Sequence, residues 1–312
     1  MNRHFLKFIA GLLIFGSNGI VASHIGMPSF EIVLLRTFIG SIAMFLIFFL
    51  RGGRLELKAI NKKHLTYLFL SGVALGASWI FLYEAYRVSG VGTSTLVYYC
   101  GPVLVIALAP VLFHEKAEPF VYVCLALVLC GMVLTNLRLL AGEGINLHGL
   151  KLSCMAAVMF AVMMITGRRA ESITGLKKSA LQIFFSFLAV AAFVLPRYEL
   201  QIPASGAEWF WVLVIGIVNT GLGCYCYFSS LNELPVRTVS VTGYLEPLTA
   251  VVLSALLLHE AFGLVEATGA ALILGGACIM ECRSCLQHLM ADTRRHALRP
   301  ALSVRRIRLK RA

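Results

Sequence analysis

Long apolar runs follow one another along almost the whole chain and constrain its fold more than any other feature. Ten of them have the roughly 17 to 25 residues that a helix needs to cross a hydrocarbon core of about 30 Å. They cover residues 5–22, 29–50, 64–87, 91–113, 119–136, 147–167, 179–195, 209–231, 236–258 and 263–280. With 59% hydrophobic and 13% charged residues, the chain has more apolar surface than a soluble domain could cover. We therefore predict an integral membrane protein.

The runs are too long for the strands of a membrane β-barrel, and they lack strict alternation of apolar and polar residues. Their backbone polar groups must be hydrogen-bonded within helices, because lipid offers no partners. The predicted fold class is an all-α bundle of ten transmembrane helices. The first run follows Arg3 and resembles a secretory signal, but nine more runs follow it without a clear small-residue cleavage site. We interpret it as the first helix.

Basic residues sort strongly by membrane side. When the connecting segments are assigned alternately from the N-terminus, 22 of the 27 Lys and Arg residues lie on the N-terminal side, 4 lie on the opposite side, and Arg36 falls within a run. Cytoplasmic segments carry such an excess, so we expect both termini in the cytoplasm, at a bacterial cytoplasmic membrane. The net charge of +12 then reflects topology, and no nucleic-acid partner is expected.

The C-terminal segment, residues 282–312, is strongly basic. It holds nine Lys and Arg residues and one acidic residue, Asp292. Near an anionic membrane surface each basic residue contributes up to about 1 kcal/mol. We interpret this tail as a topology and surface anchor that lies against anionic lipid headgroups.

Motifs for cofactors and metals are missing from the sequence. The nine cysteines lie mostly within the runs, where thiols act as small apolar groups, and Cys282 and Cys285 form a C-x-x-C without a second pair. We find no phosphate-binding glycine loop, no nucleotide-hydrolysing motif and no ligand cluster with metal spacing. No cofactor, metal or primary active transport is expected.

One unit is used twice. A shift of 145 residues lays 91–134 over 236–279 without a gap, with 12 identities in 44 positions. Polar residues and prolines coincide: Tyr99 falls on Tyr244, Pro102 on Pro247, and the His-Glu pair ending at Glu115 on the pair ending at Glu260. The predicted domains are a first five-helix repeat, 1–137, a second, 147–281, and the basic tail, 282–312.

The odd number of helices in each repeat determines their relative orientation. A unit that crosses the bilayer five times begins its second copy on the opposite side, so the two repeats are inverted about an axis in the membrane plane. Inverted repeats are typical of transporters, because their halves can exchange conformations around a central site. The duplication therefore favours alternating access.

Several residues also carry a family resemblance. They are Arg36 in the second run, the stretch Asn219-Thr220-Gly221-Leu222 in the eighth, and a proline, an apolar run and a terminal glutamate, found from Pro102 to Glu115 and from Pro247 to Glu260. In their order and spacing the chain resembles the EamA type of the drug/metabolite transporter superfamily over nearly its entire length. The resemblance implies ten helices and the export or exchange of small metabolites such as amino acids, or of drugs, with nucleotide-sugar and cofactor carriers as relatives.

Two charged residues deep in the predicted bilayer are the main site candidates. Arg36 lies seven residues past Ser29, roughly 10 Å into the bilayer, where it could be a counter-ion for a substrate carboxylate or phosphate, or be ion-paired to Glu31 or Glu84. Glu246 lies roughly 15 Å deep beside Pro247, which removes a helical hydrogen bond. It could bind a substrate amine, carry a coupling proton, or cap freed backbone amides.

Polar and aromatic residues complete the predicted site. Asn18 lies in the stretch 16–19, whose glycines weaken the first helix or allow close helix packing, and Asn219 lies on a small-residue surface. Tyr99 and Tyr244 lie mid-span, where a buried hydroxyl needs a partner. The predicted substrate-binding set is Asn18, Arg36, Tyr99, Asn219, Tyr244 and Glu246. Gating or structural roles are predicted for Glu84, Pro102, Pro247, Glu115 and Glu260.

Three classes of function follow from these features. The first is a secondary carrier or facilitator for an amino acid or related amphiphilic solute or a drug, or alternatively for an anionic or nucleotide-like metabolite. The second is an intramembrane enzyme with Glu246 or Glu84 as acid or base, for which the sequence offers no nucleophile and base together. The third is a channel or scaffold, which the inverted duplication disfavours. The oligomeric state is left open, with a homodimer as one arrangement.

Overall fold

The computed structural model describes residues 3–55, 60–105, 119–135, 147–231, 234, 242–259, 263–265, 267–276 and 279. Within them all regular structure is helical and no strand occurs, which confirms the all-α prediction for this part of the chain.

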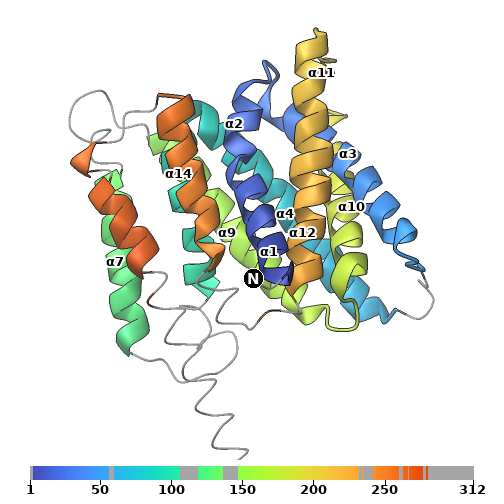
Figure 1. Ribbon diagram of the computed structural model, residues 1–312, viewed down its shortest axis with the longest axis horizontal. Coiled ribbons are helices and arrows are strands. Elements are labelled where there is room, and N and C mark those ends of the chain that lie inside the picture. The colour runs from blue at the N-terminus through green and yellow to red at the C-terminus, as the bar shows by residue number, and fades with distance from the viewer. Residues whose placement is uncertain are drawn as a thin grey trace, which may run out of the picture.

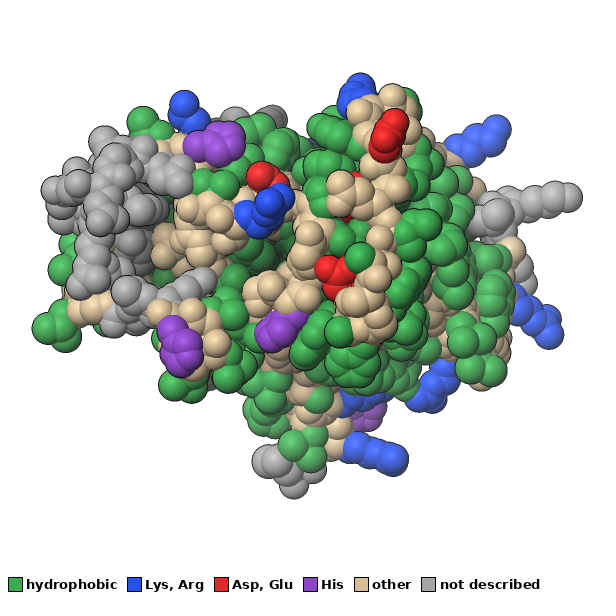
Figure 2. All heavy atoms as spheres, turned by 90° about the horizontal axis from the view of Figure 1, so that it is seen from above, with side chains coloured by type: hydrophobic (Ala, Val, Ile, Leu, Met, Phe, Trp, Pro, Cys, Tyr) green, Lys and Arg blue, Asp and Glu red, His purple; other side chains and the backbone are tan. Residues whose placement is uncertain are grey.

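Six helical stretches of the described residues are long and apolar enough to cross a membrane. They are Arg3–Ser23, made of α1 (Arg3–Gly16) and α2 (Asn18–Ser23); α3 (Ser29–Leu50); α4 (Lys62–Ser89); α9 (Leu147–Arg169); α10 (Gly175–Val194); and Gly206–Ser230, made of α11 (Gly206–Leu213), the π-helix η2 (Val214–Leu222) and all but the last residue of α12 (Gly223–Leu231). Large hydrophobic side chains lie exposed along them, and apolar groups dominate the molecule seen from above (Figure 2). These features support a membrane-embedded protein.

Shorter helices account for other predicted runs. They are α5 (Val91–Tyr98), which begins the apolar stretch Val91–Val105; α7 (Pro119–Thr135); α14 (Leu245–Leu257); and the stretch Ala267–Gly276. The total of ten transmembrane helices stays a prediction.

The helices form one bundle, with the N-terminus at its lower end and α2 and α11 at its upper end (Figure 1). α4 packs along α9 and α10, α10 along α3, and α3 along η2. On the other side α1 lies against α12 and α14, and α5 contacts both α14 and α9. α7 lies at the edge, where a Cβ atom on Gly131 would be 2.6 Å from the Gly269 carbonyl oxygen. Glycines thus let neighbouring helices approach closely.

The first candidate membrane span is broken in its middle, as one of the two alternatives for its glycines predicts. α1 ends at Gly16 and α2 begins at Asn18, with Ser17 between them at φ −82° and ψ −3°. The Asn219 side-chain amide donates to the Ile14 carbonyl at 2.7 Å and to the Ser17 hydroxyl at 3.0 Å. Asn219 belongs to the π-helix η2, a form of helix that occurs often at functional sites. η2 therefore stabilises the break.

A second kind of break occurs twice, at positions that the sequence repeat makes equivalent. Tyr99 follows the end of α5 with φ −72° and ψ 1°, and Tyr244 precedes α14 with φ −71° and ψ −6°. Each tyrosine lies three residues before a proline, Pro102 or Pro247. Proline cannot donate a backbone hydrogen bond to the preceding turn, so the helix is interrupted there in both copies.

The position of Pro247 corrects one detail of the sequence prediction. It was expected to remove a hydrogen bond from the middle of a span. Instead it is the third residue of α14, within the first turn, where backbone N–H groups have no intrahelical partner in any helix. The proline therefore fits the beginning of α14 without the cost of an interior proline.

Candidate functional site

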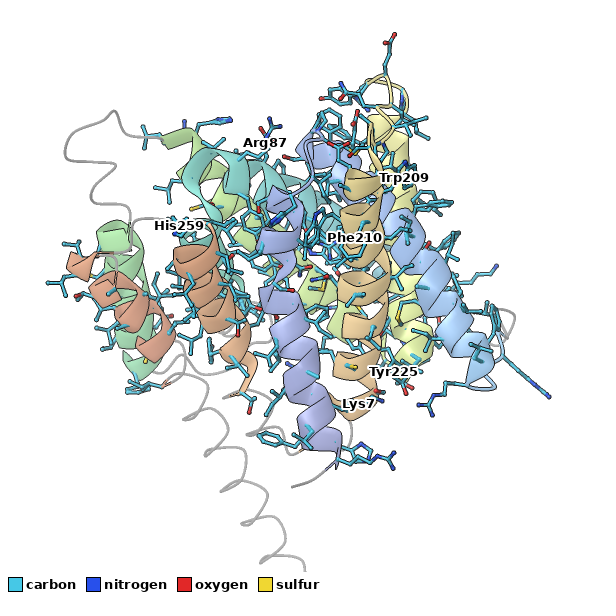
Figure 3. All side chains as sticks on the ribbon, turned by 45° about the horizontal axis from the view of Figure 1, so that its top comes forward. Lys7, Arg87, Trp209, Phe210, Tyr225 and His259 are labelled. Carbon is cyan, nitrogen blue, oxygen red and sulfur yellow. The ribbon has the colours of Figure 1, made fainter. Side chains whose placement is uncertain are left out.

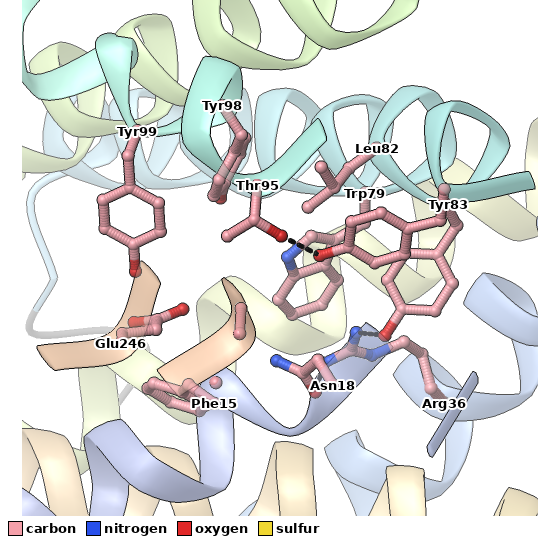
Figure 4. Close-up of a pocket in the computed structure, with 13 residues that line it drawn as sticks. Phe15, Asn18, Arg36, Trp79, Leu82, Tyr83, Thr95, Tyr98, Tyr99 and Glu246 are labelled. Carbon is pink, nitrogen blue, oxygen red and sulfur yellow. Dashed lines mark hydrogen bonds between the residues drawn. The ribbon is translucent and has the colours of Figure 1, made fainter. Parts of the chain in front are cut away.

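A pocket lies where the broken first helix meets α3, α4, α5 and α14 (Figure 4). Its walls are mostly aromatic and polar. The lining residues are Phe15, Gly16, Asn18, Arg36, Trp79, Leu82, Tyr83, Tyr86, Thr95, Tyr98, Tyr99, Glu246 and Ala250. The side chains leave room between them for only a few water-sized molecules. A larger solute therefore needs the surrounding helices to move apart.

Arg36 supplies the positive charge of this pocket. The side chain comes from α3 and is 1% exposed. Its Nε and Nη2 atoms donate to the Thr220 hydroxyl at 3.2 and 3.1 Å, Nη1 donates to the Tyr83 hydroxyl, and Nη2 reaches the Asn18 side-chain oxygen at 3.5 Å. The guanidinium carbon also lies 4.1 Å from the centroid of the Trp79 ring. Neutral groups therefore hold the cation, and an aromatic face stabilises it.

No carboxylate of the described residues forms an ion pair with Arg36. Glu31 accepts a hydrogen bond from the Gln201 backbone N–H at 3.2 Å, and Glu84 lies 4.0 Å from Arg87, with both side chains partly exposed. The predicted alternative, in which Glu31 or Glu84 neutralises Arg36, is therefore wrong. A buried guanidinium without a carboxylate partner has the charge and the planar donors that suit an anion.

Glu246 supplies the carboxyl group of the pocket. It lies in the first turn of α14, where the positive end of the helix dipole favours an anion. The Tyr99 hydroxyl points toward its carboxyl group (Figure 4). Gly16 brings α1 close, because a Cβ atom there would be only 2.8 Å from the Glu246 carbonyl oxygen. The helix break and the start of α14 thus meet at the pocket.

Aromatic rings line the space between Arg36 and Glu246. Trp79 and Tyr83 lie beside Arg36, Tyr98 and Tyr99 extend toward Glu246, and the Thr95 hydroxyl bonds to the Tyr86 hydroxyl at 3.3 Å (Figure 4). The Tyr98 ring is held by stacking on Phe160 with centroids 4.6 Å apart. The pocket can therefore contact an apolar or aromatic group between the Arg36 guanidinium and the Glu246 carboxyl group.

Four of the six predicted substrate-binding residues line this pocket: Asn18, Arg36, Tyr99 and Glu246. The other two lie elsewhere. Asn219 bonds to the break between α1 and α2, and Tyr244 packs against the apolar cluster that contains Leu96 and Cys100. Asn219 thus contacts the helix break next to Asn18 and does not line the pocket.

The residues predicted to gate or to support the structure are dispersed. Glu84 pairs with Arg87 at a partly exposed position, and Pro102 and Pro247 follow the two helix breaks without lining the pocket. Glu115 and Glu260 lie outside the described residues.

Sequence reasoning missed several pocket residues. Trp79, Tyr83 and Tyr86 were not among the predicted site residues, although their spacing of four and three residues places them on one face of α4. Thr220 was grouped with Asn219, and Thr95 was not considered. The sequence did carry a signal for them, because aromatic residues on one face of a predicted membrane span can stabilise a cation such as Arg36 in a neighbouring span.

Comparisons with known proteins agree with this architecture. The model of the EamA-like transporter family matches the chain twice, over residues 4–137 and 147–282. The uncharacterized transporter YxxF of Bacillus subtilis (strain 168) is 25% identical over 279 residues, which cover 87% of each chain. An uncharacterized transporter of Archaeoglobus fulgidus is 24% identical over 272 residues, covering 87% of this chain and 93% of that protein.

A solved crystal structure is also similar. It covers 89% of this chain and 97% of its own, with a TM-score of 0.64 at 21% sequence identity. At this identity the likeness shows a shared fold. The helical arrangement described above thus occurs in another protein over nearly its full length.

Proposed function

The chain belongs to the EamA-like transporter family, and we propose that it is a secondary carrier that moves a small metabolite across the bilayer by alternating access. Its relatives are named as transporters, which favours transport over catalysis. The observation that carries the proposal is the buried pocket in which Arg36, without a carboxylate partner among the described residues, shares a lining with Glu246. Charges at membrane depth are costly and line substrate or ion pathways.

The two ends of the pocket suggest the class of substrate. Arg36 suits a carboxylate, Glu246 suits an amine, and the rings of Trp79 and Tyr98 suit an apolar or aromatic group between them. We therefore propose an amino acid or a related amphiphilic solute, or a drug of similar character. An anionic or nucleotide-like metabolite is the second candidate, favoured by the arginine alone. Export is the proposed direction.

We further propose ten transmembrane helices in two inverted five-helix repeats, 1–137 and 147–281, with both termini in the cytoplasm. The double match to the family model supports the duplication. So do the equivalent breaks at Tyr99 and Tyr244, whose backbone angles agree within a few degrees. In transporters of inverted design, broken helices place their ends at the substrate site, as the first turn of α14 does here.

A flux assay in proteoliposomes tests the function. Radiolabelled amino acids are compared with analogues that lack either the amine or the carboxylate. Saturable flux of an amino acid with loss for both analogues supports the zwitterionic substrate, and flux of the carboxylate alone supports the anionic alternative. Chemical turnover without flux would favour the intramembrane enzyme and contradict the proposal.

Thr220 offers a test of how Arg36 is oriented. Replacing Thr220 by valine keeps the shape of the side chain and removes the oxygen that accepts two guanidinium hydrogen bonds. Hydrogen bonds to charged groups contribute about 1.5 to 3 kcal/mol, so we expect the KM for flux to rise about tenfold. Thr220→Ser keeps the hydroxyl and should retain nearly normal KM. Equal values for both variants would show that this bond does not orient the arginine.

A further inference from the structure

A second group of cations lies far from the pocket, at the end of the bundle where α1 begins. Lys7 comes from α1, Arg51 follows the last residue of α3, and both approach the ring of Tyr225 in α12. Figure 3 places Lys7 beside Tyr225 at the end opposite Arg87 and Trp209. We call Arg3, Lys7, Arg51 and Tyr225 the Tyr225 cluster.

The contacts within the Tyr225 cluster are close. The Lys7 ammonium lies 3.8 Å from the centroid of the tyrosine ring. The Arg51 guanidinium carbon lies 5.2 Å from it, and the same guanidinium donates to the Tyr225 hydroxyl. Arg3 lies four residues before Lys7 on α1, which places both on the same face of that helix. Tyr225 itself packs beside the apolar cluster of Met44 and Cys224, so one ring holds two cations at the edge of the core.

Among the described residues, no acidic side chain lies within ion-pair distance of these positive charges. The ion pair of that part of the chain joins Arg87 and Glu84 at the other end of the bundle. Like charges gathered on one ring repel each other. An anion between them would turn that repulsion into attraction, and a phosphate can accept hydrogen bonds from a guanidinium and an ammonium together.

The position of the Tyr225 cluster favours a lipid as the source of that phosphate. Lys7 lies near the start of one candidate membrane span, and Arg51 directly follows the end of the next, antiparallel one. Both therefore lie at the level of the headgroups on the same side. On the last turn of α3, Phe49 is 52% and Leu50 is 77% exposed. A phosphate at Arg51 would thus have apolar surface for acyl chains beside it.

We propose that the Tyr225 cluster binds the phosphate of an anionic phospholipid headgroup in the leaflet on the N-terminal side of the membrane. Arg51 and Lys7 hold the phosphate oxygens, the Tyr225 ring keeps the two cations in place, and the acyl chains lie along the exposed last turn of α3. The basic tail, residues 282–312, is expected in contrast to need only a negatively charged membrane surface and no specific lipid.

The test uses the full chain purified in detergent, with a matched pair of double variants. Lys7→Gln with Arg51→Gln removes two charges from the cluster, whereas Arg54→Gln with Lys62→Gln removes two exposed charges nearby that do not touch Tyr225. Melting temperature is followed during titration with phosphatidylglycerol, phosphatidylcholine or inorganic phosphate. Native mass spectrometry counts the lipids that stay bound.

Phosphatidylglycerol is expected to raise the melting temperature of the parent saturably, and one lipid should remain bound. Either single variant should raise the half-saturating lipid concentration about fivefold, because each charge contributes about 1 kcal/mol. The double variant of Lys7 and Arg51 should raise it about 25-fold. The control variant of Arg54 and Lys62 should change it less than about twofold. Equal shifts in both double variants would overturn the site. Equal effects of phosphatidylcholine or inorganic phosphate would overturn the anionic lipid as its ligand.

Discussion

Replacing Arg36 by glutamine is expected to lower the flux of a carboxylate substrate by roughly two orders of magnitude, because removing one partner of a buried charge pair costs about 2 to 5 kcal/mol. The guanidinium is 1% exposed and is held by hydroxyl, amide and aromatic groups. The lining residues of the pocket include no other Lys or Arg that could replace it. Initial rates in proteoliposomes give kcat/KM for the parent and the variant.

Folding should survive this change. A cation within the bilayer costs about 2.5 to 3.5 kcal/mol on insertion scales, and glutamine keeps an amide that can bond to Thr220 and Asn18. Arg87→Gln is the matched control, since Arg87 pairs with Glu84 at a partly exposed position. Arg36→Lys keeps the charge without the planar fork and should fall between the two. Normal flux in Arg36→Gln would remove the arginine from the site.

Replacing Glu246 by glutamine is expected to lower the flux of an amino acid much more than the flux of its analogue without the amine. The variant keeps the size of the side chain and an oxygen that can face the Tyr99 hydroxyl, and it cannot carry the negative charge that the proposed amine would need. Flux of the amino acid should fall roughly 10- to 100-fold, consistent with about 1.5 to 3 kcal/mol for hydrogen bonds to charged groups. Flux of the analogue without the amine should change little. The ratio of the two rates is the measurement.

Glu84→Gln provides the matched control for this variant, because Glu84 forms an exposed ion pair with Arg87 outside the pocket. Its selectivity should equal that of the parent. If Glu246→Gln lowered the flux of both solutes equally, the carboxylate would serve the transport cycle, as a coupling proton carrier does, and would not recognise the amine.

The sequence predicted the membrane-embedded, all-α character of the chain because apolar length and composition alone determine it. It also predicted Arg36 and Glu246 as site residues, since a charge at bilayer depth requires a cavity or a partner. Asn18 came from the glycine-rich stretch 16–19, and the structure breaks the helix there. The predictions of Arg36 and Glu246 rest on depth in the bilayer, which follows directly from the number of residues along a helix.

The direction in which each side chain points around its helix axis was harder to predict. Successive helical residues point about 100° apart, so Asn219 and Thr220 face different neighbours although they lie at nearly the same depth. The π-helix from Val214 to Leu222 shifts this phase further. As a result Thr220 bonds to Arg36, and Asn219 bonds to the break in the first helix.

The repeat was also an incomplete guide to the site. Tyr99 and Tyr244 share a position in the repeat and a backbone conformation, but only Tyr99 of the two lines the pocket. Gly101 stands where the second copy has Glu246. The pocket is therefore asymmetric, and equivalence in sequence does not assign a shared role.

Counterflow tests the proposed carrier mechanism most directly. Proteoliposomes are loaded with an unlabelled amino acid that the protein carries and are diluted into a trace of the labelled form. A carrier that alternates access exchanges the two at one site, so the label should accumulate transiently inside above its outside concentration, and Arg36→Gln should abolish this overshoot while Arg87→Gln retains it. Entry of the label only to equilibrium, without an overshoot at any internal concentration, would contradict an alternating-access carrier and indicate a channel.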